Sequence, residues 1–164
     1  LDAMITRAVA LHNSGLTGKA LAEIDTVVAK DPQRARAFRA RGEIFRQTGK
    51  AEAAFAALNE AIRLEPDANG YESRGNVFNN TRKYDRAIED YDQAIRLNPD
   101  GSRGYFARAV ARRRSGDIEG AIADAAERIT HSGTAKLVVR PPATRARTMM
   151  PMVFCASLPP WPSE

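Results

Sequence analysis

The strongest constraint on the fold is a residue pattern that returns with a period of 33 or 34 residues. An alanine marks the same point of each copy, and the same intervals separate a second small residue and a proline. The three series are Ala20, Ala54, Ala87 and Ala121; Ala8, Gly42, Gly75 and Ala109; and Pro32, Pro66 and Pro99. A fixed period of this length is typical of arrays in which each repeated unit packs on its neighbours.

The stretch from Gly75 to Pro99 shows what one unit contains. Small and large residues fall at helical spacing in two blocks, and the turn-prone residues 80–82 separate them. Proline closes the second block, because the residue before a proline is driven out of the helical region. Each unit is therefore predicted to be two antiparallel helices joined by a short turn. Glycine marks this turn in three copies, at Gly15, Gly49 and Gly116, and Arg82 replaces it in the third copy.

The helical spacing predicts eight helices and no strand before residue 130. Thr17 and Asp117 are expected to cap the helices that begin beside them, because their side-chain oxygens can accept from free backbone N–H groups. The predicted helix ranges are 1–14, 17–30, 35–48, 51–65, 69–81, 84–97, 102–115 and 118–130.

This arrangement of residues resembles the tetratricopeptide repeat, with a small residue, an aromatic, an alanine, a second aromatic and a proline. In the third copy these are Gly75, Phe78, Ala87, Tyr91 and Pro99. The resemblance covers four copies, at about 1–34, 35–67, 68–101 and 102–130. It implies an all-α, right-handed superhelical solenoid of four antiparallel helix pairs, followed by an irregular C-terminal tail at 131–164.

Small residues are expected to let the two helices of a pair approach closely. Gly42 is predicted to face Ala54, and Gly75 to face Ala87. Larger residues would then fill the space between neighbouring pairs, so that stability comes from stacking.

The resemblance also implies a function, because the first helix of each pair lines a concave surface where this family binds peptides or helices of partner proteins. Asparagine side chains there can hold a peptide backbone, and arginines can pair with carboxylates. We therefore expect a protein or peptide ligand, acidic or with a C-terminal carboxylate, and no cofactor. The predicted groove residues are Arg36, Arg39, Arg46, Asn69, Asn76, Asn79, Asn80, Arg103 and Arg113.

One subclass of the family clamps a terminal carboxylate with a set of lysine, asparagine and arginine residues. Glu43 stands at one asparagine position of that set and would repel a carboxylate. Ser73 and Ala107 replace two other members. The complete clamp is therefore rejected for this chain.

The sequence also allows functions other than peptide binding in the groove. Self-assembly is one alternative, because Ala125 and Ile129 of the last pair lack a following repeat. The chain is not expected to be an enzyme, since it has no nucleophile–base pair or phosphate loop. It can still be the interaction part of a larger enzyme whose catalytic domain lies elsewhere. Four acidic residues of the third copy are interpreted as charges on an exposed helix face; they are Asp85, Glu89, Asp90 and Asp92.

Nucleic-acid binding is also weighed. The run Arg112–Arg114 splays around a helix instead of forming one patch, and Arg112 is expected at the exposed end of the array. Nucleic acid is therefore an unlikely partner. The two histidines and Cys155 have no metal-ligand spacing. No apolar run is long enough to span a membrane, and we expect a cytoplasmic protein without a membrane partner.

The pattern stops near residue 130, and residues 131–164 hold six of the nine prolines. Three interpretations stay open for this tail. The favoured one is a shift of reading frame or a cloning artefact. The others are a disordered tail and a tail whose apolar residues fold back on the last helices or into the groove.

Overall fold

The structure is a computed structural model, and it describes residues 1–131, with side chains described through residue 128. This part of the chain contains eight helices and no strand, as the sequence predicts. The helices are α1 (Asp2–Asn13), α2 (Thr17–Lys30), α3 (Ala35–Gln47), α4 (Ala51–Leu64), α5 (Ala68–Asn80), α6 (Tyr84–Leu97), α7 (Ser102–Ser115) and α8 (Ile118–His131). The predicted ranges agree with these bounds to within one or two residues.

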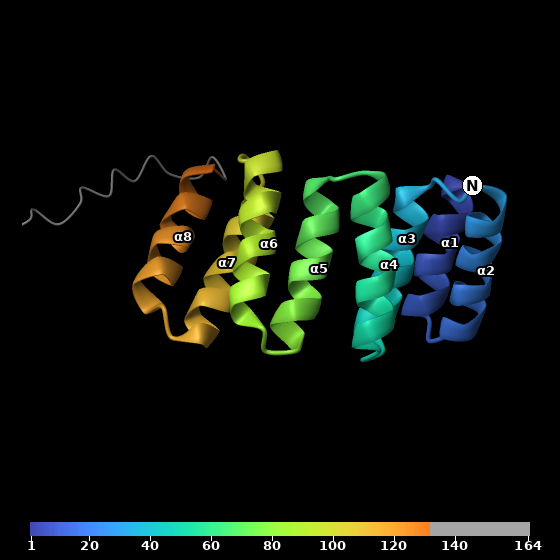
Figure 1. The fold of residues 1–164 in the computed structure, drawn as a ribbon, viewed down its shortest axis with the longest axis horizontal. Helices are drawn as coiled ribbons and strands as arrows, with labels where there is room; N and C mark the ends of the chain where they lie inside the picture. Colours follow the sequence, from blue (N-terminus) through green and yellow to red (C-terminus); the bar gives the residue numbers. More distant parts are fainter. Residues whose placement is uncertain (132–164) are drawn as a thin grey trace, which may run out of the picture.

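Consecutive helices form four antiparallel pairs that stand side by side in one row, with α1 and α2 at one end and α8 at the other (Figure 1). The first helices of neighbouring pairs contact one another, α1 with α3, α3 with α5, and α5 with α7. This confirms an all-α solenoid of helix pairs. The predicted tail lies outside the described residues, and the division of the chain near residue 130 stays a prediction.

The turns inside the pairs use one backbone conformation. Gly15, Gly49 and Gly116 have φ angles of 81°, 76° and 98°, in the left-handed region that a side chain disfavours. Arg82 adopts the same conformation with φ 60°. The replacement of glycine in the third pair therefore left the turn geometry unchanged.

Glycine packs against a large side chain of the paired helix. A Cβ atom at Gly42 would lie 2.5 Å from Cγ of Leu58 and 3.3 Å from the carbonyl oxygen of Ala54. One at Gly75 would lie 2.7 Å from Cε1 of Tyr91. The ring of Tyr91 therefore occupies the space that the missing side chain of Gly75 leaves, and the pairing of Gly75 with Ala87 stays a prediction.

The two predicted helix caps behave differently. Asp117 caps α8, since its Oδ1 accepts from the backbone N–H of Gly120 at 2.9 Å. Thr17 does not cap α2; it is the first residue of that helix, and its hydroxyl pairs instead with Nδ1 of His12 at 3.0 Å.

Each first helix carries an arginine at the same repeat position: Arg7, Arg41, Arg74 and Arg108. Three of these arginines reach buried carboxylates, in the pairs Arg7–Glu23, Arg74–Asp90 and Arg108–Asp124. Arg74 and Arg108 also reach back to the preceding pair, where they meet Asn59 and Asp92. We call this series the arginine ladder; it bonds the first, third and fourth helix pairs internally, and Arg74 and Arg108 also bond their pairs to the preceding one.

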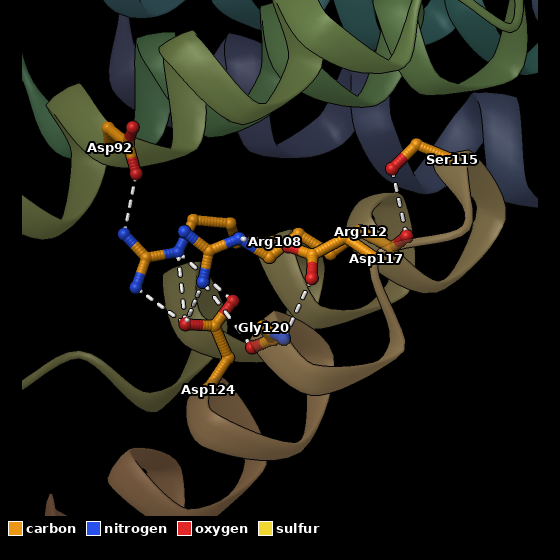
Figure 2. Close-up of polar contacts among 7 residues, drawn as sticks. All are labelled: Asp92, Arg108, Arg112, Ser115, Asp117, Gly120 and Asp124. Carbon is orange, nitrogen blue, oxygen red and sulfur yellow. Dashed lines mark hydrogen bonds and ion pairs between the residues drawn. The ribbon is translucent and has the colours of Figure 1, made fainter.

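The ladder corrects one sequence interpretation. Asp90 is buried, and its two oxygens accept from Arg74 at 2.9 and 2.7 Å, so it is not part of an exposed face. Arg112 lies in the last pair, where its Nη1 donates to Oδ1 of the buried Asp124 at 2.8 Å. Figure 2 shows Arg108 and Arg112 converging on Asp124, with Asp92 on the far side of Arg108. These ion pairs cannot be predicted from the sequence, because the burial of each charged side chain depends on the neighbouring helix.

Candidate functional site

A hollow of the described chain lies along the first helices of the pairs. It has a volume of about 640 Å³ and is lined by residues of α1, α3 and α5 together with Arg103 of α7. Part of its wall is apolar, from Ile5, Val9 and Ile44. We call this hollow the groove. It lies on the helices that the sequence analysis assigned to a ligand surface.

The structure brings five of the nine predicted groove residues to this hollow: Arg36, Arg39, Asn69, Asn76 and Arg103. The other four lie beside it or elsewhere. Arg46 pairs with Glu43, which is itself in the groove wall. Asn79 and Asn80 line a separate hollow of about 400 Å³, and Arg113 lines a third, of about 460 Å³, at the last pair. These four residues stand near the C-terminal ends of their helices, close to the turns.

The arginines of the groove are paired with carboxylates of the same chain. Arg39 bonds to Asp67, whose other oxygen caps α5 by accepting from the N–H of Gly70 at 2.7 Å. Arg36 lies 3.5 Å from Asp2. Positive and negative groups therefore alternate along the groove, and the sequence does not reveal this because the partners come from other helices.

Glu72 is the groove residue whose importance the sequence analysis missed. Only 8% of it is exposed, and its carboxylate lies 3.6 Å from Nη1 of Arg103, which is 76% exposed. Burial raises the pKa of the Glu72 carboxyl, and the opposing charge of Arg103 only partly offsets the effect. Its place in the repeat predicts that it faces inward, but no sequence signal reveals its burial.

The amides of the groove have unequal freedom to bind. Oδ1 of Asn76 accepts from the hydroxyl of Tyr91 at 2.8 Å, so its NH₂ group is left to face a ligand. Asn69 is exposed at the groove wall. Near the groove end, Nε2 of His12 pairs with Oε1 of Gln47 at 3.0 Å, which ties the first helix pair to the second. Oδ1 of Asn79 is buried and has no hydrogen-bond partner among the residues with described side chains.

The third hollow is apolar and lies at the end of the row, between α7 and α8. Phe106, Ile118 and Ile122 line it and are 56%, 53% and 65% exposed. Large exposed apolar side chains that gather in one place mark interaction surfaces on soluble proteins. The last pair therefore offers a second candidate site.

In the described part of the chain, no group of three or more histidine, cysteine, aspartate or glutamate residues could hold a metal ion. None of the eight helices is both long and apolar enough to cross a lipid bilayer.

Comparison with solved structures finds the same fold in other proteins. TTC0263, a thermophilic TPR protein in Thermus thermophilus, is 24% identical, with a TM-score of 0.72 over 80% of this chain and 74% of the other. MamA is 23% identical, with a TM-score of 0.71 over 80% of this chain and 77% of the other. MamA from Desulfovibrio magneticus RS-1 is 19% identical, with a TM-score of 0.70 over 80% and 76% of the two chains. These likenesses concern the fold alone.

Comparison with curated proteins gives no match. The family model of the tetratricopeptide repeat matches residues 5–69 and 73–135, which together make up most of the sequence. The periodic small residues, the paired helices and this match agree. The chain belongs to the tetratricopeptide-repeat family.

Proposed function

We propose that the protein is an interaction scaffold that holds an extended segment of a partner protein in the groove. The observation that carries this proposal is the hollow of about 640 Å³ in which apolar, amide and charged side chains of α1, α3 and α5 meet. Membership of a family of repeats that stack into extended concave surfaces supports it.

The groove wall suits a peptide in two ways. Val9, which is 40% exposed, can cover an apolar side chain of the ligand, with the buried Ile5 and Ile44 behind it, and such burial drives most protein association. Asn69 and Asn76 can exchange hydrogen bonds with the peptide backbone without reading its sequence. The apolar contacts would supply affinity, and the amides would orient the chain.

An acidic ligand is the finer part of the proposal. Arg36 and Arg103 are the exposed arginines of the groove, and their contacts to Asp2 and Glu72 are long, at 3.5 and 3.6 Å. Both guanidinium groups can turn to a ligand carboxylate, and such pairs are often bidentate. Arg39 is held by Asp67 at a helix cap, so we expect it to contribute through structure instead.

Binding in the groove is tested by substitutions at exposed positions, because these should change the stability of the fold only slightly. Val9→Arg fills the apolar wall with a charged side chain, and Arg96→Glu on α6 is the matched control on an exposed surface away from the groove. Partners captured by the wild-type chain should be lost with Val9→Arg and retained with Arg96→Glu. Equal capture by all three proteins would show that the groove is not the binding site.

The acidic preference has its own test on a captured partner. Peptides that tile the partner sequence are measured by fluorescence anisotropy at two salt concentrations. Arg36→Glu and Arg103→Glu should weaken binding by about tenfold and flatten its salt dependence, because exposed charge pairs are screened by salt. If affinity and salt dependence are unchanged, the proposed preference for an acidic ligand is wrong, and the groove can still be the binding site.

Self-association through the last pair is the second candidate function. The exposed Phe106, Ile118 and Ile122 on α7 and α8 favour it, since isolated chains rarely leave such a cluster uncovered. Sizing chromatography over a dilution series tests it. An apparent mass that falls on dilution supports self-association, and a constant monomer mass contradicts it.

A further inference from the structure

The apolar surface of the last pair corresponds to a surface that is covered elsewhere in the same molecule. Ala121, Ile122 and Ala125 of α8 occupy the repeat positions of Ala87, Ile88 and Tyr91 in α6. Those residues of α6 belong to one apolar cluster with α7. In α8 the equivalent positions line the third hollow, and Ile122 is 65% exposed. The last pair therefore exposes a surface that α7 covers in the preceding pair, and no described helix covers it here.

The helix that covers each internal interface contributes three packing positions with small or medium side chains. In α7 these are Gly104, Ala107 and Ala111, of which Ala107 and Ala111 pack in the cluster with α6. In α3 they are Ala37, Ala40 and Ile44, which pack in the same way in the cluster with α1 and α2.

Helix α1 carries the same surface, which no described residue covers. Ala3, Thr6 and Ala10 of α1 stand at these repeat positions, and all three are exposed. Their side chains are close in size to Gly104, Ala107 and Ala111 of α7. The α1 surface therefore matches the one that α7 uses to cover α6.

The charges at the two ends also match. Asp2 occupies the repeat position of Arg103, and Phe106 occupies that of Glu72, the residue that Arg103 approaches at 3.6 Å. A helix α1 placed as the next first helix would thus bring Asp2 beside Phe106. The guanidinium carbon of Arg128 lies 5.7 Å from the centre of the Phe106 ring. Asp2, which pairs with Arg34 and Arg36 of its own chain, would therefore meet Arg128 as a further arginine.

We propose that the occupant of the third hollow is helix α1 of a second copy of this chain, bound head to tail so that the row of helix pairs continues from one molecule to the next. The proposal rests on self-association as the second candidate function and adds its geometry. The two contacting surfaces differ, so the contact leaves a free end on each molecule. A symmetric dimer made by two copies of α8 would leave no such ends.

This asymmetry gives a complementation experiment with the full chain. Ile122→Arg places a charge in the third hollow, and Ala10→Arg places one on the α1 surface; both positions are exposed in the single chain. Each variant alone should associate at least tenfold more weakly than the wild type in analytical ultracentrifugation. An equimolar mixture of the two should form a 1:1 dimer at wild-type affinity, because each variant keeps one intact end.

Ala29→Arg on α2 is the matched control, since Ala29 is exposed and its repeat positions already hold Arg63 and Arg96. It should associate like the wild type, and circular dichroism should show all variants equally helical. If the wild type associates but the mixture stays monomeric, head-to-tail contact is wrong and self-association stands. If the wild type is monomeric, both are wrong. A monomer in which Ile122→Arg shifts the fluorescence of Trp161 identifies residues 132–164 as the occupant instead.

Discussion

Arg41 and Ala57 stand at the two positions of the arginine ladder that hold an ion pair in each of the other three helix pairs. Arg41 still reaches back to Asp25 of the preceding pair, with Nη2 3.0 Å from Oδ1. Its Nε, however, is buried and finds no hydrogen-bond partner among the residues with described side chains. The second pair therefore lacks one partner in an otherwise regular series.

Ala57→Asp is expected to complete the ladder. The new carboxylate would accept from Nε of Arg41, as Asp90 accepts from Nε of Arg74 at 2.9 Å. Leaving a buried donor unpaired is costly, and we expect the substitution to raise the free energy of unfolding by about 1 kcal/mol. Urea denaturation measures this. Ala56→Asp, at the exposed neighbouring position, should give no gain, and a gain of equal size there would contradict the explanation.

Removing a carboxylate from the arginine ladder is the converse test. Asp90→Ala leaves Arg74 without its buried carboxylate and should lower the free energy of unfolding by about 3 kcal/mol. Replacing both partners, with Arg74→Met and Asp90→Ala together, should recover part of the loss because no charge is then left unpaired. A double variant less stable than Asp90→Ala would argue against the buried pair as the cause.

The turn at Arg82 offers a site for stabilisation. Its φ of 60° places a side chain in a conformation that the other three turns reach with glycine. Arg82→Gly should raise the free energy of unfolding by about 1 kcal/mol, since L residues other than glycine are disfavoured there. Arg86→Gly, inside helix α6, should lower it by about 1 kcal/mol because glycine weakens helix interiors. Two changes of the same sign in thermal unfolding would contradict this.

The close packing of the helix pairs is tested at Ala87, which is fully buried in the cluster with Tyr91 and Ala111. Ala87→Leu should overpack this cluster and destabilise the fold by about 1–3 kcal/mol. Glu89→Leu adds the same side chain at an exposed position of α6 and should change stability by less than about 0.5 kcal/mol. Unchanged thermal unfolding of Ala87→Leu would mean that the helix register is wrong.

The buried Glu72 predicts a pH dependence. Because its pKa is raised by burial, the folded chain keeps the proton at pH values where the unfolded chain has released it. The stability that Glu72 contributes is thus present below its ordinary pKa and is lost as the pH rises through the raised value. Glu72→Gln should therefore unfold at a higher temperature than the wild type near pH 7, and the gap should close as the pH falls.

Glu60 provides a control with the opposite sign. It is only half-buried, and a hydrogen bond from Arg63 lowers its pKa, so any stability it contributes is present at higher pH and is lost as the pH falls. Glu60→Gln should give no gain near pH 7. If both variants show the same pH profile in thermal unfolding, the environment of Glu72 is not the cause.

Much of the fold follows from the sequence because its signals are local and recur from copy to copy. The alanines at the close contacts, the prolines after the first three pairs and the glycines at three of the turns each act within a few residues of themselves. They determine the helices, their pairing and the direction of stacking. The left-handed backbone at Arg82 also follows, since it occupies the place of Gly15, Gly49 and Gly116.

The tertiary structure alone decided which charged residues are surface and which are interior. Asp85 and Asp90 look alike in the sequence, yet Asp85 is exposed and Asp90 is buried against Arg74. The same holds for Glu72 and for the division of the nine predicted groove residues among three hollows and one ion pair. Burial and charge pairing arise from side chains that come together only when neighbouring helix pairs stack. The period of the sequence does not specify the distances between these side chains.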